Sequence, residues 1–215
     1  MEENKIDDLE QRVYSYISEG MAFLTTDSPN PEKALKCFEK AQRCNVHVDM
    51  SIKGNPKYRL LGLLYYRLGD VKKRFFKEDG LSSDEIRKSY TEMFELFEIS
   101  RKKLERIPEE ERENDDISML SDVLLFEAEV FMKLESIDTA LSKYHSSRET
   151  ALGLYEKAKG QADKAVIFQT LERIVHCNEM IESALRQSDR EERADSWHDR
   201  MSEYREELDM LRESD

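Results

Sequence analysis

Residues that could bind a metal are few and widely spaced in this sequence. Cys44 and His47 stand three residues apart, a spacing found in zinc sites, and Asp195 and His198 have the i, i+3 spacing of di-iron helices. A zinc site needs a second pair of ligands, and a di-iron site needs a second carboxylate–histidine pair with two further carboxylates. The sequence supplies no such partners, so we predict neither a metal nor a cofactor.

Catalytic patterns are equally sparse. There is no glycine-rich phosphate loop, no GxSxG nucleophile turn and no HExxH metal motif. His145 and His176 fall within expected helices, where packed or exposed side chains are the simpler interpretation, and Cys177 fits a small core residue. The many acidic residues are explained by solubility and by i, i+4 pairing with Lys or Arg. We therefore predict that the chain is not an enzyme.

The composition indicates an acidic, helical protein of the cytoplasm. Charged residues make up 38% of 215, and 47 acids against 34 bases give a net charge of −13. Such a surface repels phosphate backbones, which disfavours nucleic acid. The acidic start MEENKIDDLE is not a secretory signal, and no apolar run approaches the roughly 20 residues that span a bilayer. Three cysteines without a compact spacing suggest a reducing compartment.

Helical periodicity covers nearly the whole sequence. Only 7 Gly and 4 Pro interrupt it, and no stretch alternates with the period of a strand for long. Ser82 and Glu85 form a capping box that begins a long helix, and Pro108 ends that helix. The expected helices cover residues 6–24, 30–44, 56–69, 83–107, 117–134, 139–158, 167–185 and 188–215. We expect Gly69 and Asp70 to end the third of these.

Small residues followed by aromatic residues recur where these helices would cross. Residues 124–147 contain Ala128 and Phe131, then Ala140, Tyr144 and Ser147. The opening hairpin has Gly20 and Phe23, then Ala34, Phe38 and Ala41. A weaker match begins at Gly62 and Tyr65, but Arg74 stands where its next small residue is expected.

This pattern resembles degenerate tetratricopeptide repeats, which are helix–turn–helix units of about 34 residues. The resemblance implies an all-α fold without a β-sheet, in which about seven or eight helices form antiparallel hairpins stacked as a short array. It also implies a groove that binds a peptide or helix of another protein. One subgroup grips acidic carboxyl-terminal peptides with Lys and Asn of its first helices, but residues 6–24 contain neither. An unrelated α-helical bundle is the alternative fold.

A basic stretch is the most informative surface feature. Residues 53–77 hold eight basic residues against Asp70 alone, a net charge of +7, with tyrosines and phenylalanines interleaved. One interpretation is a solvated face over a buried aromatic face. The other is a site for an acidic or amphipathic segment of a partner, with charge steering the encounter and aromatics anchoring it. The predicted contact residues are Arg59, Tyr66, Arg67, Lys73 and Arg74.

The terminal segment 188–215 is acidic, with a net charge of −6, yet it keeps an apolar seam at heptad-like spacing. Its residues are Trp197, Met201, Tyr204, Leu208 and Leu211, after Ala194. Such a seam needs a cover, and three uses stay open: capping the array, pairing with a second copy, or docking on a partner. The helix could also lie against the basic stretch as an autoinhibitor.

From the sequence we therefore predict a helical-hairpin domain over 1–187 and a capping or oligomerisation helix over 188–215. The predicted function is a non-enzymatic adaptor, assembly or regulatory factor that binds another protein, without membrane or nucleic-acid partners. The alternative is a structural homo-oligomer, such as a homodimer, assembled through the terminal helix.

Overall fold

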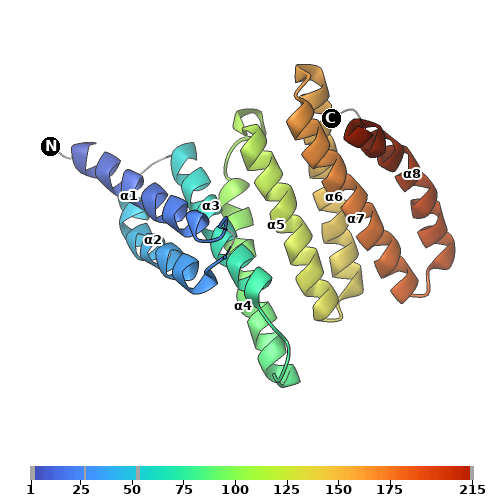
Figure 1. Cartoon of the computed structure of the whole chain (residues 1–215), viewed down its shortest axis with the longest axis horizontal. Coiled ribbons are helices and arrows are strands. Elements are labelled where there is room, and N and C mark those ends of the chain that lie inside the picture. The colour runs from blue at the N-terminus through green and yellow to red at the C-terminus, as the bar shows by residue number, and fades with distance from the viewer. Residues whose placement is uncertain (1–2, 27, 52–53, 214–215) are drawn as a thin grey trace. The chain divides into compact units, whose positions relative to one another are not determined.

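The computed structural model describes the backbone of residues 3–26, 28–51 and 54–213, and the side chains of residues 11–26, 28–44 and 54–213. Within these ranges the chain is α-helical and contains no strand (Figure 1). The elements are α1 (Glu3–Ala22), α2 (Pro31–Ser51), α3 (Asn55–Phe75), α4 (Ser83–Leu104), the 3-10 turn η1 (Glu109–Glu111), α5 (Asn114–Lys133), α6 (Ile137–Gln161), α7 (Lys164–Gln187) and α8 (Glu191–Glu213). The predicted all-α fold of helical hairpins is confirmed. No described helix is long and apolar enough to cross a membrane.

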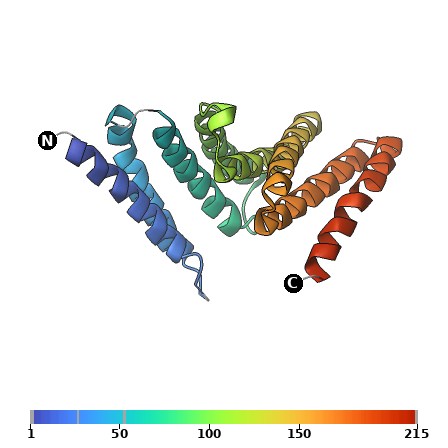
Figure 2. The same cartoon turned by 90° about the horizontal axis from the view of Figure 1, so that it is seen from above.

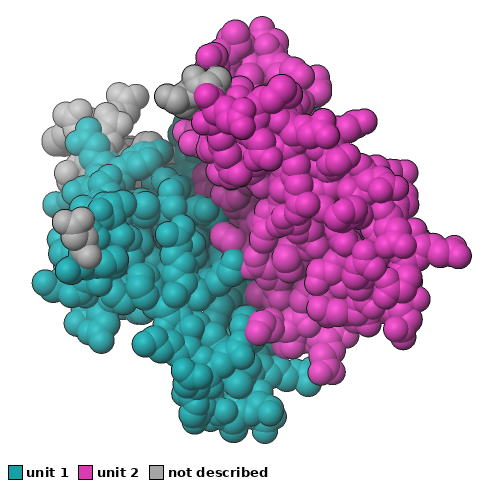
Figure 3. All heavy atoms as spheres, turned by 45° about the vertical axis from the view of Figure 1, so that its right-hand side comes forward, with its two compact units in different colours: residues 1–111 teal, residues 112–215 magenta. Residues whose placement is uncertain are grey.

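The helices form two compact units, residues 1–111 and 112–215 (Figure 3). In the first unit α1 packs on α2, α2 on α3 and α3 on α4; in the second, α5 packs on α6, α6 on α7 and α7 on α8. Consecutive helices within a unit run in opposite directions (Figure 2). The sequence-based division at residue 187 does not coincide with this one, because α8 packs within the second unit.

Glycines in the first unit allow two helices to approach the ring of a phenylalanine. A Cβ atom built on Gly20 of α1 would lie 2.5 Å from Cε1 of Phe38 in α2, and one built on Gly69 of α3 would lie 2.6 Å from Cε1 of Phe97 in α4. Real Cβ atoms essentially never come within 3.0 Å of such atoms, so only glycine fits at these crossings. Both rings are fully buried.

The third expected hairpin also crosses closely at Gly62, as predicted: a Cβ atom built there would lie 2.8 Å from Cγ and Cδ2 of Leu104, the last residue of α4. What the sequence missed is the second close contact of this hairpin, at Gly69. Gly69 does not end the helix; α3 continues to Phe75. The reason is that Gly69 is buried against Phe97, so packing offsets the roughly 1 kcal/mol that a glycine costs inside a helix.

The second helix of three hairpins repeats one buried spacing. A large ring stands four residues after one core residue and three before another, in the series Ala34–Phe38–Ala41, Met93–Phe97–Ser100 and Ala140–Tyr144–Ser147. All nine side chains are buried. In the last hairpin, Ala194 and Met201 are buried at the same positions, but His198 stands between them, and its Nδ1 lies 3.3 Å from Oε2 of Glu182 in α7.

Polar groups are also matched at these crossings. Ser121 Oγ of α5 donates to the carbonyl of Ser147 in α6 at 2.9 Å, and Ser147 Oγ donates back to the carbonyl of Ser121 at 2.8 Å. In the first unit, Ser100 Oγ donates to the carbonyl of Gly62 at 2.7 Å. Small hydroxyl residues therefore bring two helix backbones close while satisfying their own hydrogen-bonding groups.

The predicted start of the long helix is confirmed. Ser82 precedes α4 with extended backbone, its Oγ accepts from the Glu85 amide, and the Glu85 carboxylate accepts from the Ser82 amide. Those hydrogen bonds lower the pKa of Glu85 from its usual 4.5. In the second unit, α6 ends where the chain turns at Ala162, whose backbone is left-handed with φ of 53°.

Candidate partner-binding surface on α3

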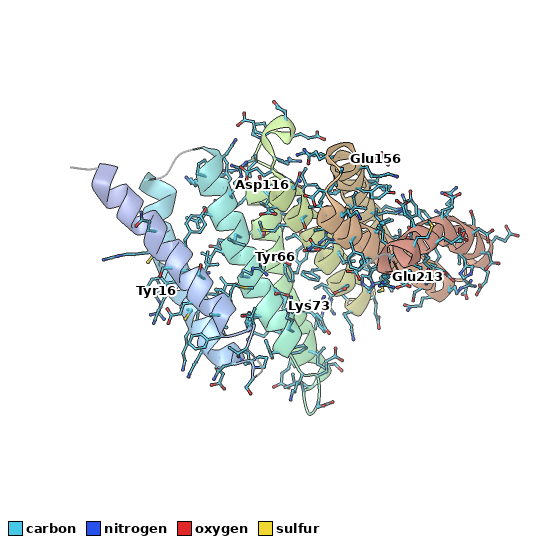
Figure 4. The ribbon with its side chains drawn as sticks, turned by 45° about the horizontal axis from the view of Figure 1, so that its top comes forward. Tyr16, Tyr66, Lys73, Asp116, Glu156 and Glu213 are labelled. Carbon is cyan, nitrogen blue, oxygen red and sulfur yellow. The ribbon has the colours of Figure 1, made fainter. Side chains whose placement is uncertain are left out.

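The predicted contact residues lie on one stripe of α3. Steps of three and four residues join Arg59, Leu63, Tyr66, Arg67, Asp70, Lys73 and Arg74, and we call this stripe the α3 face. The neighbouring stripe supplies the core residues Leu60, Leu64 and Val71, each no more than 2% exposed. Figure 4 locates Tyr66 and Lys73 on α3. The α3 face itself is only partly open: Tyr66 and Asp70 are 8% and 2% exposed, whereas Arg74 is exposed and Arg67 and Lys73 are partly exposed.

A buried carboxylate organises the centre of the α3 face. Asp70 is 2% exposed; Arg74 Nε donates to its Oδ1 at 2.7 Å, and Arg67 Nη1 lies 4.0 Å from its Oδ2. The Arg67 guanidinium also stacks over the ring of Tyr66, 4.9 Å from its centroid. One carboxylate thus holds two guanidinium groups in place, and a net positive charge remains beside the ring.

The remaining predicted residues have different roles. Arg59 lies about three turns before Asp70. Its Nη2 donates to the carbonyl of Glu111 at 2.7 Å, and the side-chain amide of Asn55 donates to the Glu111 carboxylate. Arg59 therefore helps to fix η1 beside α3. Lys73 is partly exposed on the face itself.

Aromatic residues interleaved with the basic stretch are distributed over several sides of α3. The guanidinium of Arg106 lies 5.6 Å from the centroid of the Tyr58 ring. The Phe76 ring packs edge-on against the Tyr90 ring of α4, with 5.4 Å between the two ring centroids. Phe75, at the end of α3, is 40% exposed. Of these aromatic residues, only Tyr66 belongs to the α3 face. It stands four residues before Asp70, so the two side chains lie on the same side of the helix.

The seam residues of the terminal helix are packed within the second unit. Met201 and Leu208 are 1% and 4% exposed, in one apolar cluster with Leu171 and Ile174 of α7. Tyr204 and Leu211 are partly buried against the same cluster, and Trp197 is partly buried against a neighbouring cluster that contains Ala194.

An open groove of about 390 Å³ lies between α7 and α8. Ion pairs cross it from Arg205 to Glu179 at 2.5 Å and from Arg212 to Glu172 at 3.2 Å. Val175 and Leu208 contribute its buried apolar side chains. Because the charged groups of the groove pair with one another across it, these contacts hold α8 against α7.

Residues considered for metal binding or catalysis are separated or paired elsewhere. Asp195 and His198 contact Arg186 and Glu182 respectively, and the side chain of His47 lies outside the described residues. Burial raises the pKa of the Cys177 thiol to about 11, which disfavours the reactive thiolate. Among the described residues, no group of three or more His, Cys, Asp or Glu side chains could hold a metal ion.

Comparison with known proteins gives structural likenesses only. No family model matches the sequence, and no curated protein matches it significantly. A de novo designed helical repeat protein, DHR64, is 20% identical over 97% of this chain and 99% of its own, with a TM-score of 0.49. The DHF119 filament is 21% identical over 96% and 99%, with a TM-score of 0.47. BtubC from P. vanneervenii is 14% identical over 94% and 92%, with a TM-score of 0.30.

Proposed function

We propose that this chain is a non-enzymatic, cytoplasmic protein–protein interaction module, similar to tetratricopeptide repeats, that holds an acidic or amphipathic segment of a partner against the α3 face. The observation that carries the proposal is the buried Asp70 carboxylate, which fixes Arg67 and Arg74 beside Tyr66. Guanidinium groups that are already held in place lose less side-chain entropy when they bind a carboxylate.

The tetratricopeptide-like assignment is supported by the repeated crossings. Gly20 meets Phe38, and Gly69 meets Phe97; in the second unit Ala128 and Tyr144 are fully buried in one cluster. The same small-to-large pairing in three hairpins is typical of helices that stack closely side by side.

The charge pattern supports an acidic partner. The α3 face combines four cationic residues with one carboxylate, in a chain whose net charge is −13. An acidic segment is attracted to this face and repelled by most of the remaining surface, which favours a single orientation on encounter. Arg and Tyr are also among the residues that contribute most to binding at interfaces.

Charge reversal of Lys73 and Arg74 tests the proposal. The probe is a synthetic amphipathic helix of Glu and Leu residues, and its binding is measured by calorimetry. Lys73→Glu with Arg74→Glu should weaken binding at least about tenfold without lowering helix content. The matched control reverses Arg87 and Lys88, which are exposed on α4 and change the net charge equally. Equal binding by both double variants would refute the α3 face as the site.

Self-association through α8 is the alternative function. Its support is the heptad-like seam, but Met201 and Leu208 of that seam are already buried in the second unit. Pairing of two copies through these residues would require α8 to leave α7. Sedimentation of the full chain and of the chain without residues 188–215 separates the two functions: a monomer in both cases leaves the binding module.

A further inference from the structure

The second unit carries a cluster of cations around the chain's single tryptophan. Arg148 of α6 lies 5.2 Å from the centroid of the Trp197 ring of α8, and Arg200 lies 5.3 Å from it. The His145 ring lies 5.0 Å from the same ring. We call this surface the Trp197 patch; it consists of His145, Arg148, Arg193, Trp197, Arg200 and Tyr204.

The patch is continuous because its residues recur at helical steps on two helices. Arg193, Trp197, Arg200 and Tyr204 follow one another at steps of four, three and four on α8. Arg148 joins the helices: its guanidinium also lies 5.8 Å from the centroid of the Tyr204 ring, and its Nε donates to Asn178 Oδ1 of α7 at 2.7 Å. Its position is therefore fixed from three sides.

The arginines of the patch differ from other arginines of this unit. Those others form ion pairs with carboxylates: Arg173 with Asp122, Arg186 with Glu182, Arg190 with Asp138, Arg205 with Glu179 and Arg212 with Glu172. Within the part of the chain that the structure describes, no carboxylate forms an ion pair with Arg148, Arg193 or Arg200. Two guanidinium groups, those of Arg148 and Arg200, thus lie over the Trp197 ring, and Arg193 stands one turn before it on α8; among the described side chains none of the three is paired with a carboxylate, on a helix segment that is otherwise acidic.

Electrostatics around His145 agree with this arrangement. Burial is the largest cause that lowers its pKa below the usual 6.5, and the positive charge of Arg148 and then of Arg193 lowers it further, while Glu149 raises it. Burial and the two arginines therefore favour the neutral imidazole. The same positive charges would attract an anion to the patch.

We infer that the Trp197 patch is a second interaction surface, which binds a short segment of a partner protein that carries one or two carboxylates next to an apolar side chain. A guanidinium stacked on a ring still presents its N–H groups at the edge, where a carboxylate accepts two parallel hydrogen bonds. Trp, Tyr and Arg are the residues most enriched where binding energy concentrates. An extended polyanion fits poorly, because the surrounding acids of α8 repel it.

This inference does not depend on the α3 face, which belongs to the other unit. The test uses Trp197 itself, since it is the only tryptophan and its fluorescence reports on the patch directly. The probe is a short synthetic peptide of Glu and Phe residues, and the control probe has Gln in place of every Glu. We expect a saturable change of Trp197 fluorescence with the acidic peptide alone.

Variants then locate the interaction. Arg193 and Arg200 are exposed, so Arg193→Glu with Arg200→Glu should keep the helix content and weaken peptide binding at least about tenfold. Arg200→Lys keeps the charge but loses the planar stacking, so an intermediate loss is expected. The control is again the reversal of Arg87 and Lys88, which should bind as the unmodified chain does.

Other results would overturn the inference. An unchanged Trp197 signal with the acidic peptide, or an equal response in the Arg193 and Arg200 double variant, would show that the patch binds no such segment. An equal response to inorganic phosphate, or to the Gln peptide, would replace a polypeptide site with a general anion site or an apolar contact. Charge reversal of Lys73 and Arg74 should leave the Trp197 fluorescence change with the acidic peptide unaltered, because the α3 face belongs to the other unit. Loss of that change would contradict a separate site at the patch.

Discussion

The contact between Gly69 and Phe97 leads to a prediction about stability that runs against ordinary helix propensity. Replacing a helical glycine by alanine normally stabilises a helix by about 1 kcal/mol. At Gly69 the added Cβ would lie 2.6, 2.8 and 2.9 Å from three atoms of the Phe97 ring, which is fully buried. Overpacking in a core costs about 1–3 kcal/mol, and contacts this short suggest the upper end. We therefore expect Gly69→Ala to destabilise the chain by about 2 kcal/mol net.

Gly153 provides the matched control, because it also lies within a helix and a Cβ built there meets nothing within 4 Å. Gly153→Ala should stabilise by about 0.5–1 kcal/mol. Urea unfolding followed by far-ultraviolet circular dichroism measures both variants. Phe97→Leu removes the two ring atoms nearest the new methyl group, so the double variant with Gly69→Ala should lose at least about 1 kcal/mol less than the sum of the single changes. If Gly69→Ala were as stable as Gly153→Ala, the close crossing of α3 and α4 would be refuted.

Three further changes test the packing and charges described above. Asp70→Asn leaves two arginines without their carboxylate and should destabilise the chain by about 1–2 kcal/mol, since those arginines remain partly solvated; an unchanged urea midpoint would contradict this role. Met201→Ala should cost about 2–4 kcal/mol in unfolding followed by tryptophan fluorescence, whereas Met210→Ala, at a side chain that is 64% exposed, should cost little; equal costs would mean that α8 is not packed as described. The pKa of His145 is lowered in the folded chain, so the neutral imidazole contributes to the free energy of unfolding. That contribution is present above pH 6.5 and is lost as the pH falls below that value. His145→Gln should remove that part of the pH dependence, and a His145 pKa at or above 6.5 by nuclear magnetic resonance would exclude this explanation.

Local periodicity was sufficient to predict the helices and the crossings of two hairpins, that of α1 with α2 at Gly20 and Phe38 and that of α5 with α6. Ala128, Ala140 and Tyr144 were found because α5 and α6 are joined by a very short turn, which keeps their crossing residues at the expected separation. In the hairpin of α3 and α4, Gly62 was found but the contact of Gly69 with Phe97 was missed, since these two are 28 residues apart and a glycine before Asp70 resembles a helix end. The spacing of Met93, Phe97 and Ser100 was the available signal, because it repeats that of Ala34, Phe38 and Ala41.

Charge density along the sequence predicted where cations concentrate, but not how they are held. Asp70 was counted only as one negative charge among eight positive ones, whereas its burial makes it the group around which Arg67 and Arg74 are arranged. Whether an acid on a helix is buried depends on the helices packed beside it, which composition does not contain. The same limit explains the seam of α8, since heptad spacing predicts an apolar stripe but does not distinguish α7 from a second copy as its cover.

The Trp197 patch shows why surface sites are harder to predict than crossings. Two residues mark each crossing in the sequence, a small one on the first helix and a large one on the next. The position of one therefore limits where the other can stand. In the patch, Arg148 and Arg200 stand more than 50 residues apart, and they meet only because α6 and α8 both pack on α7. Each of these arginines alone resembles any other arginine on a solvated helix. What distinguishes them is that, among the described residues, neither forms an ion pair with a carboxylate, and only the folded arrangement of all three helices reveals it.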